Sequence, residues 1–176
     1  MIANALTALR LLLIGPVTAA FARPELMAPA LLLALIAIAI ASDFLDGAVA
    51  RWRGTASSAG QVFDHTTDFL FVTISLSGAA WAGLVTPLLP LLIVVAFSQY
   101  VLDSRFRHRD KQLRMSVIGR WNGILYFVPL VVLAAARLDW PGGMGYVLQE
   151  AGWWLAWPLL AATLVSILDR AMAPVR

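Results

Sequence analysis

Long apolar runs alternate with short polar connectors along the whole chain. A helix that crosses a membrane needs about 20 mostly apolar residues. Six stretches meet that length: 4–22, 28–50, 61–83, 86–105, 117–137 and 151–170. Little chain remains outside them, so we expect no separate soluble domain. The pattern predicts an all-α integral membrane protein in which residues 1–176 form a single membrane domain of six transmembrane helices.

The connectors between these runs indicate how neighbouring helices are joined. Residues 51–60, RWRGTASSAG, are rich in Gly and Ser and make the second and third helices antiparallel neighbours. A tight turn is expected around Thr86 and Pro87. The stretch PGGMG, residues 141–145, lacks the Lys-Ser/Thr of a phosphate-binding loop, so we interpret it as a turn as well.

Composition supports a membrane protein. The chain is 61% hydrophobic and 13% charged, whereas a soluble domain is about half apolar and about a quarter charged. It has no cysteine, which excludes disulfides, thiolate catalysis and cysteine-ligated metals. The first apolar run contains Arg10 and no charged segment precedes it, so we expect this run to be retained rather than cleaved as a signal peptide.

The basic residues predict the orientation in the membrane. With the N-terminus in the cytoplasm, ten Lys and Arg residues fall on the cytoplasmic side, while only Arg23 and Arg137 fall on the other side. Cytoplasmic loops of membrane proteins carry an excess of such residues. We therefore predict that both termini are cytoplasmic, which an even number of helices also requires. The ten are Arg51, Arg53, Arg105, Arg107, Arg109, Lys111, Arg114, Arg120, Arg170 and Arg176.

Four aspartates stand in residues 42–68, SDFLDGAVARWRGTASSAGQVFDHTTD, where two apolar runs meet a connector. Asp43 and Asp46 are three residues apart, and Asp64 and Asp68 are four apart, so each pair shares one face of its helix. Because the connector is short, both pairs lie at the same end of adjacent helices. We expect the four carboxylates to converge on one site.

Such a cluster needs a counter-charge. An acid at the centre of a membrane helix costs about 2.5–3.5 kcal/mol, and Arg51 and Arg53 are too few to neutralise four. Oxygen ligands suit Mg²⁺, which keeps waters and is often completed by substrate phosphates. The alternative is the ion or proton pathway of a transporter. A transporter is expected to show broken helices or inverted repeats, and none is visible in the sequence.

Small residues accompany the acids. Gly47 and Ala50 adjoin Asp43 and Asp46, and Gly60 opens the third helix. They admit either a ligand or a neighbouring helix close to the backbone, and both interpretations remain open. Arg51 follows at the helix end, where its planar guanidinium suits a phosphate.

With its spacing, the stretch reads Asp43-x2-Asp46-Gly47-x2-Ala50-Arg51-x8-Gly60-x3-Asp64-x3-Asp68 and resembles the signature of CDP-alcohol phosphatidyltransferases at every defined position. The pattern Asn4-x2-Thr7-x2-Arg10 is similar to the first helix of the phosphatidylglycerophosphate synthase branch. The resemblance implies transfer of a phosphatidyl group from CDP-diacylglycerol to an alcohol, with release of CMP. It also implies a homodimer acting at the cytoplasmic face of the inner membrane, and we expect no nucleic-acid partner.

The resemblance assigns roles to individual residues. Asp43, Asp46 and Asp64 would ligate two Mg²⁺ (or Mn²⁺) ions, and Asp68 would be the general base that also contacts the second ion. The expected substrate-binding residues are Gly47, Ala50, Arg51 and Gly60 at the nucleotide, together with Thr7 and Arg120. His65 lies between Asp64 and Asp68, but its helix angle is expected to turn it away from both, so we assign it a structural role. His108, in the basic connector, is expected to be solvated.

The acceptor alcohol is indicated by the basic connector that leads to Arg120 on the same side as the acids. A phosphorylated acceptor such as glycerol 3-phosphate needs basic partners, although the orientation rule alone also places arginines there. Residues 119–123, GRWNG, depart from the Gly-Lys-x-Lys-Thr-like stretch of phosphatidylglycerophosphate synthases. Glycerol 3-phosphate is our first choice, with inositol phosphate, inositol, serine and phosphatidylglycerol as alternatives.

Overall fold

A computed structural model describes residues 2–52, 58–102 and 117–172. Within these ranges every regular element is helical, as predicted, and none is a strand. The elements are α1 (Ile2–Ala22), the 3-10 turn η1 (Pro24–Leu26), α2 (Pro29–Trp52), α3 (Ser58–Trp81), α4 (Leu88–Leu102), α5 (Val117–Leu125), α6 (Phe127–Ala136), the 3-10 turn η3 (Pro141–Gly143) and α7 (Met144–Met172).

Several residues with predicted roles lie outside these ranges. They include most of the basic connector that was expected to bind a phosphorylated acceptor. The residues outside the described ranges are Arg53, Arg105, Arg107, His108, Arg109, Lys111, Arg114 and Arg176.

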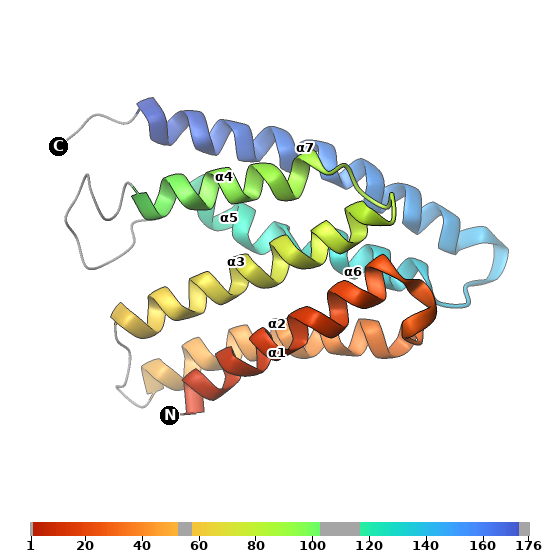
Figure 1. Cartoon of the computed structure of the whole chain (residues 1–176), viewed down its shortest axis with the longest axis horizontal. Coiled ribbons are helices and arrows are strands. Elements are labelled where there is room, and N and C mark those ends of the chain that lie inside the picture. The colour runs from red at the N-terminus through yellow and green to blue at the C-terminus, as the bar shows by residue number, and fades with distance from the viewer. Residues whose placement is uncertain (1, 53–57, 103–116, 173–176) are drawn as a thin grey trace.

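The helices form one elongated bundle in which successive helices run in alternating directions, except that α6 continues in the direction of α5 (Figure 1). α1 packs against both α2 and α3, and α7 packs against α4 and α6. Figure 1 shows the start of α1, the end of α2 and the start of α3 at one end of the bundle, where α4 and α7 also end. The acidic ends of α2 and α3 therefore lie beside the first turns of α1.

Within the described ranges, four stretches are long and apolar enough to cross a membrane: Ala5–Ala22, Pro29–Asp46, Gly119–Ala136 and Pro141–Met172. A shorter apolar helix covers Leu88–Leu102. α3, which carries Asp64 and Asp68 in its first half, is not among the four. These lengths and compositions support a multi-pass membrane protein, while the count of six spans and the orientation stay predictions.

The expected helix 117–137 is interrupted at Tyr126, which separates α5 from α6. Pro129 explains the break, because a proline has no N–H to donate to the carbonyl four residues earlier, here Leu125. Tyr126 keeps helical dihedrals (φ −64°, ψ −20°), and its N–H donates to the carbonyl of Asn122 at 2.9 Å. The interruption is therefore a bend in a continuing helical path.

The last helix begins at Met144, seven residues before the expected start at 151. Its first turns are not apolar enough to belong to a hydrophobic run, but nothing in YVLQE, residues 146–150, opposes a helix. The predicted turn at PGGMG is confirmed in its first part, where Gly142 (φ 65°) and Gly143 (φ 78°) adopt left-handed dihedrals that glycine accepts without strain.

The core contact between α1 and α3 positions the site. A Cβ atom added to Gly78 of α3 would lie 2.6 Å from the carbonyl oxygen of Thr18 on α1, so only glycine allows the helices to approach this closely. Arg10 lies eight residues before Thr18, and Asp68 lies ten before Gly78. At 1.5 Å per residue these separations are about 12 and 15 Å. The contact therefore sets the register in which Arg10 meets Asp68.

Arg137 braces the opposite end of the bundle. Its Nη1 donates to the carbonyl of Ala20 at 2.9 Å, and its Nη2 donates to the carbonyls of Pro24 at 2.6 Å and Met27 at 3.0 Å. These three carbonyls belong to the end of α1 and the turn that follows it. Arg137 thus links the end of α6 to the turn between α1 and α2, at the end of the bundle away from the acidic cluster.

Candidate functional site

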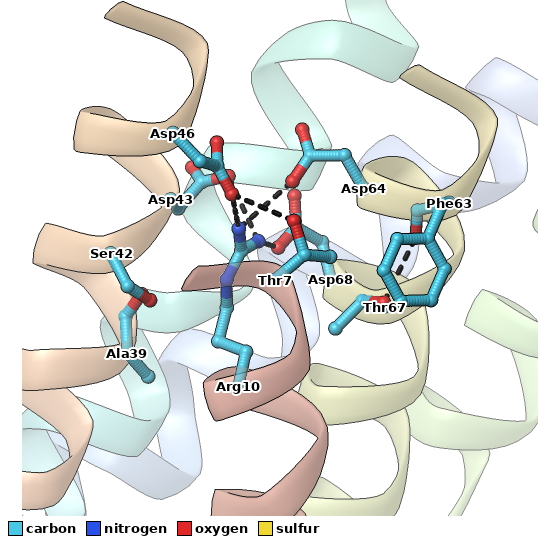
Figure 2. A network of polar contacts seen from close by, with 10 residues as sticks. All are labelled: Thr7, Arg10, Ala39, Ser42, Asp43, Asp46, Phe63, Asp64, Thr67 and Asp68. Carbon is cyan, nitrogen blue, oxygen red and sulfur yellow. Dashed lines mark hydrogen bonds and ion pairs between the residues drawn. The ribbon is translucent and has the colours of Figure 1, made fainter. Parts of the chain in front are cut away.

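The four aspartates meet at one place between α2 and α3. Figure 2 shows the carboxylates of Asp43 and Asp46 facing those of Asp64 and Asp68 across a common centre. Oxygens of Asp43, Asp46 and Asp64 all lie within 4.8 Å of one another. The spacing of three and four residues places each pair on one helix face, and the antiparallel pairing of α2 and α3 brings the two faces together, as the sequence predicts.

Arg10 occupies the centre of this cluster (Figure 2). Its Nη1 lies 2.9 Å from Oδ1 of Asp43, and its Nη2 lies 2.8 Å from Oδ1 of Asp64. The guanidinium is also ion-paired with Asp46 and Asp68. Its side chain is completely buried, with 0% exposure. One cation from α1 thus contacts all four carboxylates from α2 and α3.

This role of Arg10 was not predicted from the sequence, which pointed instead to Arg51 and Arg53 as the nearby cations. A signal was nevertheless present, because a buried arginine inside an apolar run needs an anionic partner. Thr7 stands one turn earlier on the same helix face, and its Oγ1 donates to Oδ2 of Asp46 at 3.1 Å. Thr7 and Arg10 of the first-helix pattern therefore both lie at the acids.

The cluster is closed on one side and open on the other. Asp46 is 4% exposed, whereas Asp43 is 40%, Asp64 is 23% and Asp68 is 24% exposed. The three more exposed acids line a cavity of about 480 Å³. Its wall near α2 is apolar and includes Ile40 and Phe44. A ligand in this cavity would contact both carboxylates and apolar side chains.

Helices α4, α5 and α7 contribute polar side chains to the lining of the cavity, and we call these residues the polar wall. The guanidinium carbon of Arg170 lies 4.9 Å from the ring centre of Tyr100, and Arg120 lines the same cavity. Buried atoms of three lining residues have no hydrogen-bond partner among the residues described: Oε1 of Gln99, the hydroxyl of Tyr100 and Nδ2 of Asn122. Leaving such a group unpaired costs about 1–3 kcal/mol.

Sequence reasoning named only Arg120 on this wall. Gln99 and Asn122 carried a usable signal, because each is an amide inside an apolar helix. Tyr100 and Arg170 gave none, since tyrosines and arginines near helix ends fit interfacial anchoring and orientation.

The remaining predicted residues are placed as follows. Gly60 is half-buried in the first turn of α3. Gly47, Ala50 and Arg51 belong to the last turns of α2, and their side chains lie outside the described part of the structure. Arg120 is exposed on α5. The nucleotide-binding roles of these residues stay predictions.

The expectation that His65 turns away from the acids is wrong. A ring nitrogen of His65 and oxygens of Asp64 and Asp68 lie within 4.8 Å of one another, and His65 lines the cavity. The reason is helical geometry, since residues three apart share a face and His65 stands three residues before Asp68.

The donor set fits a hard divalent cation. Two groups of three ligands share Asp64, one with Asp43 and Asp46 and the other with His65 and Asp68. Carboxylate oxygens are the ligands that Mg²⁺ prefers, and imidazole nitrogen also binds divalent metals. The guanidinium of Arg10 balances only one of the four carboxylate charges. The cluster therefore keeps an excess of negative charge for a metal.

Comparison with known proteins adds the family. A family model described as CDP-alcohol phosphatidyltransferase matches residues 1–166, which include the acids, Thr7, Arg10 and Arg120. The curated proteins and the solved structures each yielded no match. The matched region spans nearly the whole chain and agrees with the acidic signature between residues 43 and 68. The chain belongs to the CDP-alcohol phosphatidyltransferase family, whose members are enzymes that transfer substituted phosphate groups.

Proposed function

We propose that this enzyme transfers the phosphatidyl group of CDP-diacylglycerol to a small phosphorylated alcohol and releases CMP. Family membership supports phosphatidyl transfer from a CDP-alcohol in phospholipid synthesis. The observation that carries the proposal is the convergence of four carboxylates from α2 and α3, three of which line a cavity. Basic side chains line the same cavity, so donor and acceptor can meet within it.

In the proposed reaction, the acceptor hydroxyl attacks the phosphorus that carries the diacylglycerol. A new oxygen–phosphorus bond forms, and the bond from that phosphorus to the bridging oxygen of the diphosphate breaks, so that CMP leaves. The hydroxyl proton must be accepted during the attack, and Asp68 is the proposed base. Asp68 lines the cavity and is 24% exposed, which lets an acceptor approach it.

The acids also give the enzyme a place for its metals. We propose that Asp43, Asp46, Asp64 and Asp68 ligate two Mg²⁺ or Mn²⁺ ions, with His65 as an additional donor. When bound, such ions neutralise charge that develops on the diphosphate and on the leaving CMP. Thr7 would orient Asp46 through its hydrogen bond at 3.1 Å.

The lipid donor requires a site that opens toward the membrane. Phe44, on the apolar wall of the cavity, is 76% exposed, so this wall is accessible to acyl chains. Six spans with both termini in the cytoplasm would place the acids at the cytoplasmic face of the inner membrane. By family resemblance we propose a homodimer, with Gly47, Ala50, Arg51 and Gly60 lining the nucleotide.

The acceptor is proposed from the polar wall. Arg120 and Arg170 line the cavity that also holds Asp68, so an anionic group bound by them would place a hydroxyl near the base. Gln99, Tyr100 and Asn122 add polar side chains to the same lining, which suits an acceptor with further hydroxyls. Glycerol 3-phosphate satisfies both features and remains our first choice. Inositol phosphate is the main alternative, ahead of inositol, serine and phosphatidylglycerol.

A transporter is not favoured by any described feature. The interruption at Tyr126 keeps helical dihedrals and its backbone hydrogen bond, so it differs from the unwound segments that bind ions in transporters.

The test is CMP release by the purified protein from CDP-diacylglycerol with Mg²⁺ and a panel of acceptors. We expect glycerol 3-phosphate to stimulate release more than the other alcohols. Stimulation by inositol phosphate instead would change the acceptor and keep the transferase. Release that no acceptor stimulates would contradict the proposed reaction.

A further inference from the structure

Arg10 is paired with the same carboxylates that a metal ion would need. Its Nη1 and Nη2 lie 2.9 Å and 2.8 Å from oxygens of Asp43 and Asp64, one on each side of the cluster. The same guanidinium is ion-paired with Asp46 and Asp68. Asp64 belongs to both groups of potential metal ligands. Arg10 therefore contacts members of both groups of potential ligands.

A divalent ion and this guanidinium compete for the same four carboxylates. Mg²⁺ binds carboxylate oxygens at about 2.0–2.1 Å and demands near-octahedral geometry. A carboxylate oxygen that accepts a hydrogen bond from Arg10 has less electron density and less room for the metal. The two cations also repel one another, and that repulsion is strong where water is scarce. Metal binding must therefore weaken or break contacts of Arg10.

In the absence of metal, Arg10 has a stabilising role. Four carboxylates without a counter-charge would repel one another in a largely buried site, and removing one partner of a buried ion pair typically costs about 3–5 kcal/mol. Because Arg10 comes from α1 while the acids come from α2 and α3, its ion pairs also hold three helices together.

We propose that Arg10 is an exchangeable counter-cation: it neutralises the aspartates in the metal-free enzyme and leaves them when metal binds. Arg10 thereby stabilises the metal-free protein and lowers its affinity for metal. The inference rests on the metal site of the proposed function and not on the identity of the acceptor. If Arg10 instead held the aspartates in place permanently, its removal would weaken metal binding.

The test is Mn²⁺ binding by the full-length protein without nucleotide or lipid substrate. The protein is stripped with EDTA, free Mn²⁺ is followed by electron paramagnetic resonance, and thermal unfolding is recorded with and without the ion. For Arg10→Gln we expect Mn²⁺ affinity to rise at least about tenfold, equivalent to about 1.4 kcal/mol. The unfolding midpoint in EDTA should fall, and Mn²⁺ should raise it by more than in the wild type.

Arg137→Gln is the matched control, because Arg137 also crosses between helices but hydrogen-bonds only to carbonyls in its described contacts. This variant should lose stability in EDTA while its Mn²⁺ affinity stays that of the wild type. Unchanged or weaker Mn²⁺ binding by Arg10→Gln would overturn the inference.

Arg10→Lys provides a second comparison if Arg10→Gln does not fold. A single ammonium cannot present the planar fork of a guanidinium, so this variant should also bind Mn²⁺ more tightly than the wild type, and equal or weaker binding would overturn the inference. The proposed function is judged separately by CMP release. If the protein released no CMP but Arg10→Gln still bound Mn²⁺ more tightly, the transfer reaction would be refuted. The exchange of Arg10 for metal would still be supported.

Discussion

Gly78 of α3 lies against the backbone of Thr18 on α1 so closely that an added Cβ would stand 2.6 Å from the Thr18 carbonyl oxygen and 2.9 Å from its Cγ2. This contact fixes the distance between α1, which carries Arg10 and Thr7, and α3, which carries Asp64 and Asp68. The geometry of the acidic cluster therefore depends on a glycine that lies well outside it.

Gly78→Ala should destabilise the protein and lower its activity. Overpacking of a tight contact typically costs about 1–3 kcal/mol, and displacement of α1 would misplace Thr7 against Asp46. We expect a lower unfolding midpoint in detergent and slower CMP release. Gly15→Ala on α1 is the control, because its Cβ would meet nothing within 4 Å. Equal effects of the two substitutions would show that the contact does not position the site.

Asp68→Asn should nearly abolish transfer in a protein that still folds, because Arg10 keeps its ion pairs with the other three aspartates. The amide is close in shape to the carboxyl group but cannot accept the acceptor's proton, and general-base catalysis is worth about 10²–10⁴-fold. We expect CMP release to fall by this factor while CDP still binds, measured by calorimetry with Mg²⁺ present. Normal turnover by this variant would remove Asp68 as the base.

Removal of metal should stop the reaction reversibly. After treatment with EDTA we expect no CMP release, and addition of Mg²⁺ or Mn²⁺ should restore it. Asp46→Asn should raise the Mg²⁺ concentration needed for half-maximal activity by more than about tenfold, since losing a charged ligand costs more than about 1.4 kcal/mol. Asp139→Asn, an exposed acid outside the cluster, is the control. Full activity in EDTA would contradict a metal-dependent mechanism.

Much of the site follows from local spacing in the sequence. The separations between Asp43 and Asp46 and between Asp64 and Asp68 define two helix faces. A connector of about ten residues makes the two helices antiparallel neighbours and restricts how these faces are oriented relative to one another. The cluster is therefore predictable without tertiary information. The same reasoning, applied to His65, would have placed it beside Asp68, because those two residues also stand three apart.

The position of Arg10 was beyond such reasoning. It stands 33 residues before Asp43 and 54 before Asp64, and no local spacing connects it to them. Its place depends on the packing of α1 on α3. That packing is set at Gly78, which the sequence alone does not distinguish from the other small residues. The bend at Tyr126, by contrast, could be predicted from the sequence. Pro129 indicates a break in a run that hydropathy alone treats as one helix.

The residues of the polar wall could also be recognised as a group only from the fold. Gln99 and Tyr100 of α4, Asn122 of α5 and Arg170 of α7 come together only because α7 packs against both α4 and α5. In the sequence each is a single polar residue in or near an apolar run. Their shared cavity with Asp68 is what links them to the acceptor.

Arg170→Gln should weaken binding of a phosphorylated acceptor. Its guanidinium lies over the ring of Tyr100, with the carbon 4.9 Å from the ring centre, and lines the cavity beside Arg120. Loss of a charge-assisted contact costs about 1.5–3 kcal/mol, so the KM for glycerol 3-phosphate should rise roughly tenfold or more while the KM for CDP-diacylglycerol changes little. Because contacts made equally in the ground and transition states affect KM rather than kcat, kcat should change less.

The matched control is Arg23→Gln, which removes an arginine next to the α1–α2 turn, away from the cavity. It should leave the KM for the acceptor unchanged, because Arg23 lies outside the cavity wall. Comparison with an uncharged acceptor such as inositol sharpens the test further. If Arg170 binds a phosphate, Arg170→Gln should reduce the preference for glycerol 3-phosphate over inositol. An equal loss with both acceptors would mean that Arg170 supports the cavity wall through Tyr100 and does not contact the anion.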